Sequence, residues 1–203
     1  MFERTLRSVK PFHLPARALV FLKHKVSECT GVLLVGGAST RFGSPKALAR
    51  FGGETLAGRA WRVLGEAFPQ RLAVGKGDLE LPFPVVVEPP QPQSPLVGVI
   101  AGLRAAATEA AVFLPVDCPL VTPALLQELA ERRAVPQTGP LPGAYSKDDL
   151  QELDRRLQSG DWSLRGVNPR VLDADARLLA NANTPQELSA LERDLAALHL
   201  DRA

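Results

Sequence analysis

The stretch GVLLVGGASTRFGSPKAL, which begins at residue 31, places glycines, hydroxyl groups and basic side chains directly after a short aliphatic run. Gly36 and Gly37 have no Cβ, so their backbone amides can approach an anion closely. Arg41 can bind a phosphate with two parallel hydrogen bonds, and Lys46 adds a compact positive charge. We therefore interpret this segment as a phosphate-binding loop, with an ordinary charged surface loop as the alternative.

Two common phosphate-binding motifs do not fit this loop. A Walker loop needs Gly-Lys followed directly by Ser or Thr, whereas Gly43 is followed here by Ser44 and Pro45. A dinucleotide fingerprint needs glycines at G-x-G-x-x-G spacing, which the loop lacks. These two familiar phosphate-binding loops are therefore excluded.

Asp117 is the second residue that could take part in the chemistry of a site, because it follows the run VFLPV and ends an expected strand. A carboxylate that faces a phosphate loop suits Mg²⁺, which takes few protein carboxylates and completes its shell with phosphate and water oxygens. A turn-capping aspartate is the alternative. Glu88 ends the neighbouring expected strand and could support the same site. Cys118 is predicted to be a packing residue, since no histidine lies near it in sequence.

The elements that must position these residues alternate along the chain. Short β-branched runs alternate with amphipathic stretches, which predicts a mostly parallel sheet covered by helices on both faces. The expected strands are 32–35, 71–74, 83–88 and 110–117, and the expected helices are 56–68, 96–108 and 122–133. Thr122 is the expected N-cap of the third helix, with Pro123 at its first position.

The C-terminal part shows weaker patterns. Residues 135–145 are rich in proline and glycine and predict an active-site loop with short extended pieces. A helix over 147–158, a short helix capped by Ser163 and a strand over 171–173 are expected to follow. The motif NANTPQEL predicts a final helix with Thr184 as N-cap and Glu187 completing a capping box.

The amino-acid composition limits the classes of protein to which this chain can belong. The chain has 203 residues with 45% hydrophobic content, which is enough for one sizeable core. Its net charge of +2 is dispersed, which argues against a nucleic-acid partner, and no apolar run is long enough to span a membrane. Two distant cysteines favour a reducing compartment, so we expect a cytoplasmic protein. Residues 1–29 are interpreted as a basic N-terminal extension of unknown role, with a strand or helix as the alternative, and 30–203 as the functional domain.

Five segments, in the same order, resemble nucleotidyltransferases that transfer NMP from an NTP, and specifically the molybdenum cofactor guanylyltransferases. LLVGGASTRFGSPKAL looks like the signature loop of that family, and SPLVGVIAGL resembles its Gly-Pro-Leu-Ala-Gly segment. LPVDCPLVTPALL is similar to its metal-aspartate segment, LQSGDWSLRG to a Gly-x-x-Ser-Leu-Arg stretch, and NANTPQEL to its Asn-x-Asn-Thr-Pro motif. The resemblance covers about residues 31–188.

The resemblance implies a Rossmann-like three-layer α/β/α nucleotidyltransferase fold with a mostly parallel central sheet. It implies GMP transfer from GTP to Mo-molybdopterin with Mg²⁺, giving the guanine dinucleotide cofactor and pyrophosphate. Transient contact with cofactor-pathway proteins or acceptor molybdoenzymes is compatible with that role. Carried over by position, the implied catalytic residues are Arg41, Lys46 and Asp117, with Asp117 as the metal ligand. The implied pterin-side residues are Asn181 and Asn183. The implied nucleotide-binding residues are Leu34, Val35, Gly36, Gly37, Ser39, Lys46, Gly75, Glu88 and Asp117.

Three departures from the family pattern concern the base. Val35 stands where alanine is usual, Gly75 stands where some relatives carry a base-contacting asparagine, and Glu88 replaces an aspartate. The pair Gly36-Gly37 resembles the GTP-using branch, so we expect GTP to be preferred over CTP and ATP by about two orders of magnitude. The alternatives are a CTP-dependent molybdopterin cytidylyltransferase, another small nucleotidyltransferase such as a sugar-1-phosphate enzyme, and a nucleotide-binding regulator without turnover.

Overall fold

The computed structural model describes residues 28–36, 42, 45–77 and 79–200. Its elements are β1 (Cys29–Leu34), η1 (Lys46–Leu48), β2 (Arg50–Phe51), β3 (Glu54–Thr55), α2 (Leu56–Ala67), β4 (Gln70–Gly75), β5 (Val85–Val87), α3 (Pro95–Ala105), β6 (Ala110–Pro115), α4 (Pro123–Arg132), β7 (Val135–Pro136), β8 (Gly143–Ser146), η2 (Lys147–Asp149), α5 (Leu150–Ser159), β9 (Val171–Leu172) and α6 (Pro185–Leu200).

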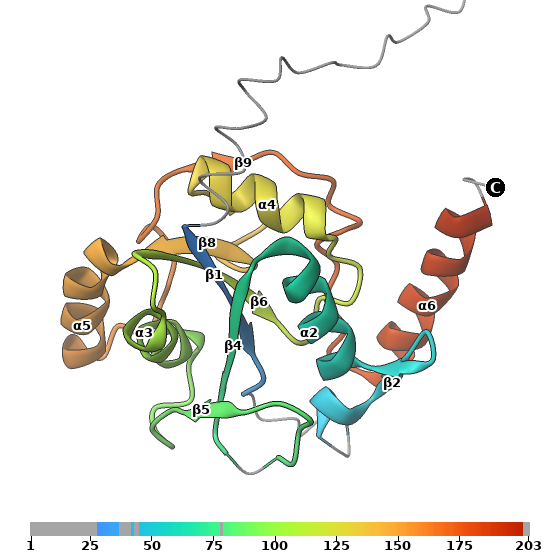
Figure 1. Ribbon diagram of the computed structural model, residues 1–203, viewed down its shortest axis with the longest axis horizontal. Coiled ribbons are helices and arrows are strands. Elements are labelled where there is room, and N and C mark those ends of the chain that lie inside the picture. Colours follow the sequence, from blue (N-terminus) through green and yellow to red (C-terminus); the bar gives the residue numbers. More distant parts are fainter. Residues whose placement is uncertain (1–27, 37–41, 43–44, 78, 201–203) are drawn as a thin grey trace, which may run out of the picture.

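The central sheet has the order β5-β4-β1-β6-β8, and all its pairings are parallel except that of β8 with β6. Helices α2 and α4 cover one face of the sheet, and α3 and α5 cover the other (Figure 1). This arrangement confirms the predicted three-layer α/β/α fold with a mostly parallel sheet.

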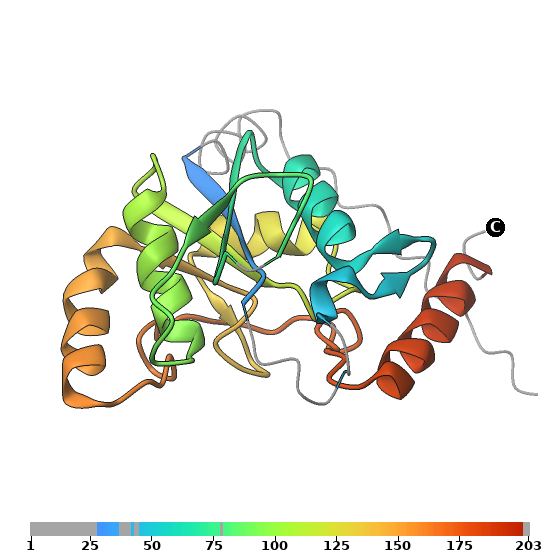
Figure 2. The ribbon, with the colours of Figure 1, turned by 90° about the horizontal axis from the view of Figure 1, so that it is seen from below.

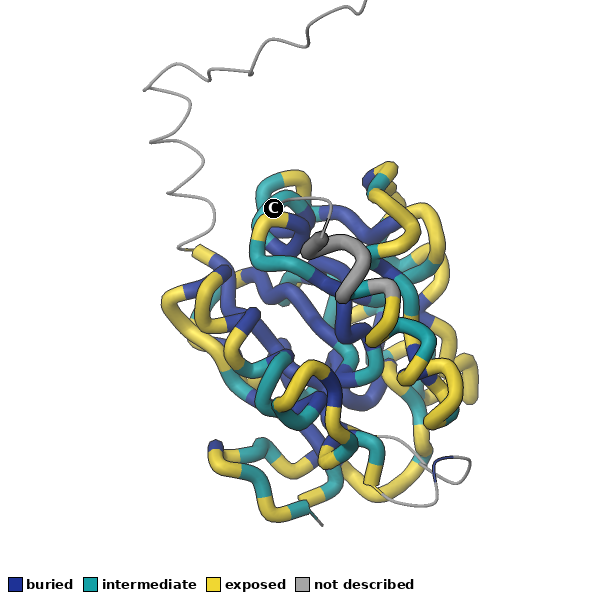
Figure 3. Tube along the Cα trace, turned by 90° about the vertical axis from the view of Figure 1, so that its right-hand side faces the viewer, coloured by how far each residue is buried: buried dark blue, intermediate teal, exposed yellow. Residues whose placement is uncertain are grey.

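Every residue of β1 is buried, which is expected of a central strand covered on both faces. Successive side chains of a strand point to opposite faces, so β1 contributes to two separate cores. Leu33 packs in the core beneath α2 and α4, while Val32 and Leu34 pack in the core beneath α3 and α5. Figure 3 shows buried chain along the centre of the molecule and exposed chain around it.

The helix starts follow from the sequence. Thr55, Ser94 and Thr122 lie at the N-caps of α2, α3 and α4, and the hydroxyl oxygen of each accepts a hydrogen bond from a backbone N–H of the first turn. The predicted cap at Thr122 is therefore confirmed. Gly102 lets α3 pack closely on the sheet, because a Cβ there would lie 2.5 Å from the Phe113 ring.

The carboxyl ends of the parallel strands bring several loops to one edge of the sheet. The strand order reverses at β1, with β4 and β5 on one side and β6 on the other. Main-chain hydrogen bonds continue just past β1, since the Val35 N–H donates to the Val74 carbonyl and the Val116 N–H to the Leu34 carbonyl. Ligands of open α/β sheets bind at such a switch point, so this edge is where a site is expected.

The proline- and glycine-rich region does contain short extended pieces, as predicted. β7 pairs in parallel with β9, and β8 forms the antiparallel edge of the main sheet. The predicted short helix at Ser163 is wrong, because the chain forms a turn over residues 165–167 instead. The Ser163 hydroxyl accepts from the Arg165 N–H only two residues ahead, which closes a turn rather than a helix.

A small hairpin, β2–β3, lies beside α6 at the opposite end of the molecule from α5 (Figure 2). Its turn holds Gly52 and Gly53 at positive φ values of 58° and 85°, which other residues rarely adopt. The Gly52 N–H donates to Glu192 Oε1 at 2.8 Å and so ties the hairpin to α6. Within the described part of the chain, no helix is both long and apolar enough to cross a membrane.

Candidate active site

Three segments that are distant in sequence meet at Lys46. Its ammonium group lies 3.2 Å from Asp117 Oδ2 and 3.1 Å from Asn183 Oδ1. Lys46 opens η1 after the glycine loop, Asp117 follows β6, and Asn183 precedes α6. The side chains of Lys46 and Asp117 are 15% and 24% exposed, so the ion pair is partly shielded but open to solvent. The structure thus brings together the predicted phosphate lysine, metal aspartate and pterin-side asparagine.

Hydrogen bonds of the backbone N–H groups of Ala182, Asn183 and Thr184 fix the position of Asn183. The Ala182 N–H donates to the Asp117 carbonyl at 2.9 Å, and Ala182 itself is fully buried. Glu187 Oε2 accepts from the N–H groups of Asn183 and Thr184, and the Thr184 hydroxyl oxygen accepts from the Glu187 N–H. The predicted capping box is confirmed, and it holds Asn183 next to Lys46.

Asn181 lies in the same segment as Asn183 and is exposed. The buried Ala182 separates the two asparagines and attaches their segment to the loop after β6. An exposed amide two residues from Asn183 can contact a ligand that reaches this side of the site. Its pterin-side role stays a prediction.

Cys118 belongs to the core and not to the reacting groups. It is buried within the cluster beneath α2 and α4, and its thiol lies 3.6 Å from Asp117 Oδ1. Burial raises the pKa of the Cys118 thiol well above its usual value, and the Asp117 carboxylate raises that pKa further. A neutral, buried thiol fits the predicted packing role.

A second group of predicted residues surrounds Glu88, which is only 7% exposed. The Glu88 N–H donates to the Gly75 carbonyl at 2.8 Å, and Glu88 Oε1 lies 3.2 Å from the Lys76 ammonium. Lys76 also donates to the Pro89 carbonyl at 2.6 Å. Sequence reasoning missed Lys76, and the only available signal was its position in the Gly75-Lys76-Gly77 turn after a strand.

Neighbouring side chains lie close to two glycines of this group. A Cβ on Gly36 would lie 2.6 Å from Glu88 Oε1, and a Cβ on Gly75 would lie 2.6 Å from Val35 Cγ2. The departures from the family pattern at Val35 and Gly75 are therefore coupled, because the Val35 side chain occupies the space that a side chain at position 75 would need. Glu88 fills the space left by the missing methyl of Gly36.

The remaining predicted residues fall into two sets. Leu34 is buried at the end of β1 with its side chain in the core beneath α3, and its carbonyl accepts from the Val116 N–H. Gly37, Ser39 and Arg41 lie outside the described residues. The roles carried over to all these positions stay predictions.

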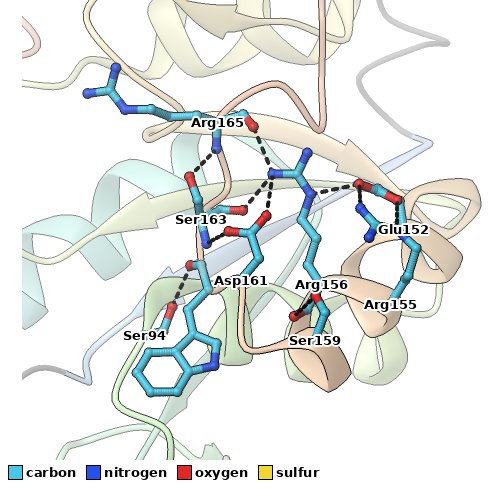
Figure 4. Close-up of polar contacts among 9 residues, drawn as sticks. Ser94, Glu152, Arg155, Arg156, Ser159, Asp161, Ser163 and Arg165 are labelled. Carbon is cyan, nitrogen blue, oxygen red and sulfur yellow. Dashed lines mark hydrogen bonds and ion pairs between the residues drawn. The ribbon is translucent and has the colours of Figure 1, made fainter.

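Arg156 organises the loop that carries the LQSGDWSLRG motif (Figure 4). Its Nη1 donates to the carbonyls of Ser163 and Arg165 at 2.9 and 2.8 Å. The Ser94 hydroxyl donates to the Trp162 carbonyl at 2.9 Å and so attaches this loop to the start of α3. The motif therefore has a structural role in joining α5 to α3, while Trp162 stays 52% exposed.

A mostly parallel sheet with Gly36, Lys46 and the strand-end carboxylate of Asp117 at its switch point is an arrangement typical of nucleotide-binding α/β proteins. Residues 31–168 match the family model of the MobA-like NTP transferase domain, so the chain belongs to that family.

A curated relative agrees with this assignment, and two solved structures share the fold. The chain is 30% identical over 201 residues to a probable molybdenum cofactor guanylyltransferase of Chloroflexus aggregans, a match that covers 84% of this chain and 97% of the relative. It is similar in structure to molybdopterin-guanine dinucleotide biosynthesis protein A of Archaeoglobus fulgidus, with 21% identity and a TM-score of 0.69 over 83% and 99% of the two chains. A Mycobacterium tuberculosis protein in complex with manganese matches with 23% identity and a TM-score of 0.58 over 81% and 98%.

Proposed function

We propose that this enzyme transfers GMP from GTP to Mo-molybdopterin and releases pyrophosphate. The observation that carries the proposal is the contact of Lys46 with both Asp117 and Asn183, in a chain of the MobA-like NTP transferase family. The named guanylyltransferase relatives support the choice of substrates. We predicted a catalytic domain of residues 30–203 with residues 1–29 as an extension; because Cys29 is a buried residue of β1, the proposed domain begins with it.

The reaction places two anionic substrates against each other. An oxygen of the terminal phosphate of the pterin attacks the α-phosphorus of GTP, and the bond from that phosphorus to the β-phosphate oxygen breaks. A phosphate monoester is already a nucleophile near neutral pH, so no acid–base dyad is needed. Lys46 supplies positive charge between the nucleotide side and the pterin side, and Arg41 and the loop amides are proposed to add more.

The residues present fit a Mg²⁺ ion. No cluster of three or more histidine, cysteine or acidic side chains suited to a metal occurs among the described residues, so a closed protein cage is not the expected form of the site. Mg²⁺ instead needs one or two carboxylates plus phosphate oxygens, and Asp117 offers a partly exposed carboxylate beside the lysine of the glycine loop. When bound, Mg²⁺ would neutralise charge on the phosphates. We propose Asp117 as its protein ligand.

Guanine is proposed to bind near Gly36, Gly75 and Glu88. Gly36 is exposed just past β1, the buried Gly75 ends β4 beside it, and the Glu88 carboxylate lies against Gly36. Polar groups of this kind reject a mismatched base strongly when they are left unpaired. Transient contacts with cofactor-pathway proteins or acceptor molybdoenzymes belong to the same proposal, because the product must reach them.

The test is pyrophosphate release from GTP in the presence of Mg²⁺ and Mo-molybdopterin, with mass spectrometry of the pterin product. The expected result is release that depends on all three components and a product that carries one added GMP. GTP binding without turnover would instead indicate a nucleotide-binding regulator. Turnover with CTP but not GTP would assign the chain to the cytidylyltransferase branch.

A further inference from the structure

We infer that Lys76 is a positioning residue for base selection, because it fixes the carboxylate of Glu88 beside the proposed guanine site. The inference rests on the proposed GTP-dependent function. It concerns a residue for which the resemblance to the family implies no role, and it explains how selectivity can be kept with glycine at position 75.

The sheet delivers the two side chains to the same place. Gly75 of β4 is the register partner of Val87 of β5, so Lys76 and Glu88 are the next residues to leave this edge of the sheet. The Lys76 ammonium lies 3.2 Å from Glu88 Oε1 and donates to the Pro89 carbonyl at 2.6 Å. Two acceptors from one short segment hold the ammonium in a single position.

The environment makes this pair stronger than a surface ion pair. The side chains of Lys76 and Glu88 are 21% and 7% exposed, so solvent screens their interaction only in part. Within the part of the chain that the structure describes, Lys76 is the only ion-pair partner of Glu88. Removing the lysine would therefore leave a buried carboxylate without its counter-charge and free to reorient.

The carboxylate is oriented by what lies around its two oxygens. Oε1 lies above the Cα of Gly36, where a Cβ would come within 2.6 Å of it, and Oε2 faces Gly98 of α3, where a Cβ would come within 3.0 Å. Lys76 binds Oε1, the oxygen next to the loop that follows β1. The orientation of the carboxylate relative to that loop thus depends on Lys76.

An oriented carboxylate distinguishes the bases by their donor patterns. It only accepts hydrogen bonds, and the Watson–Crick edge of guanine presents two adjacent donors, N1–H and the N2 amino group. Adenine and cytosine present a single amino group next to an acceptor ring nitrogen, which repels a carboxylate. Selectivity of this kind is partly repulsive, so it weakens when the carboxylate can turn away.

The experiment measures kcat/KM for GTP, ITP and ATP by pyrophosphate release with Mo-molybdopterin, in the wild type and in Lys76→Met, Lys76→Arg and Lys147→Met. ITP lacks only the N2 amino group. Lys147 is the matched control, because it pairs with Glu109 at 3.8 Å near the amino end of β6, away from the site. Lys76→Met should lower the GTP-to-ATP and GTP-to-ITP ratios about tenfold, the scale of one charge-assisted hydrogen bond. Lys76→Arg should keep most of both ratios, and Lys147→Met should change neither.

Ratios taken on one protein preparation do not depend on its folded fraction, so a purely structural loss cannot imitate the expected result. If Lys76→Met fails to accumulate, Lys76→Ala gives the same comparison, since it too removes the donor that contacts Glu88 and the Pro89 carbonyl. Unchanged ratios in the variant that is measured would overturn the role of Lys76, while GTP preference in the wild type would leave the proposed function standing. A wild type without GTP preference would refute the proposed base choice itself.

Discussion

At the scale of single residues, the site is built from a few charges at the end of buried strands. Lys46 is positioned by two oxygen acceptors that come from different loops, and Asp117 is attached to the Asn183 segment through its own carbonyl. Charge placement of this kind can stabilise phosphoryl transfer without a proton-transfer residue. The charge of Asp117 is therefore the first to test, because Asp117 is the proposed ligand of Mg²⁺.

Asp117→Asn keeps the shape of the side chain and removes its charge. We expect turnover to fall about 10²-fold or more, the scale for losing one preorganised electrostatic contact, while the melting temperature changes little because this side chain is partly exposed. Steady-state pyrophosphate release and thermal unfolding measure the two effects. Asp175→Asn is the control, because Asp175 pairs with Arg177 on the surface. Turnover of the variant at the wild-type level with ordinary Mg²⁺ would remove Asp117 from the mechanism.

At the scale of elements, the capping box at the start of α6 has two roles: it begins the helix and it positions Asn183 in the site. The capping box satisfies backbone N–H groups of the Asn183-Thr184 segment and thereby determines where Asn183 lies. The sequence motif predicted this cap correctly, because a capping box depends on neighbours three residues apart. The turn at Ser163 was not predicted, since the same residue type can close a turn or begin a helix.

Glu187→Ala tests the cap. It removes the acceptor of two backbone N–H groups, so we expect a loss of about 1 kcal/mol of stability and a higher KM for Mo-molybdopterin with little change in KM for GTP. Chemical denaturation and steady-state kinetics provide the two readouts. The exposed neighbour Gln186, changed to alanine, is the control. An equal rise in both KM values would mean that α6 supports the whole site and not the pterin side.

At the scale of the whole molecule, two buried thiols make stability sensitive to alkaline pH. Burial raises the pKa of Cys29 and of Cys118 above the value of 9.0 for an unfolded thiol. Above pH 9 the unfolded chain loses these protons while the folded chain keeps them, so the stabilisation is complete below that pH and declines as the pH rises toward the folded values.

We expect the free energy of unfolding to fall between about pH 8 and pH 10, and to fall less in the double variant Cys29→Ala, Cys118→Ala. Urea unfolding at a series of pH values measures this. Parallel curves for the two proteins would show that the thiols do not titrate differently on folding.

Most of the architecture could be predicted from the sequence, because alternating strand and helix patterns and local caps depend on near neighbours. The contact of Lys46 with Asn183 spans 137 residues, so only the resemblance to a family suggested that these residues share a site. The pair Lys76–Glu88 was missed, because a lysine in a turn is usually a solvated residue. The coupling of Val35 to Gly75 likewise depends on packing between two strands, which no local pattern reveals.

The transfer of GMP by this fold and site can be measured in a single competition experiment. Equimolar GTP, CTP and ATP are incubated with the enzyme, Mg²⁺ and Mo-molybdopterin in one vessel, and the dinucleotide products are quantified by mass spectrometry. We expect the guanine dinucleotide in about 100-fold excess over the cytosine and adenine products. An excess of the cytosine dinucleotide, or no dinucleotide at all, would contradict it.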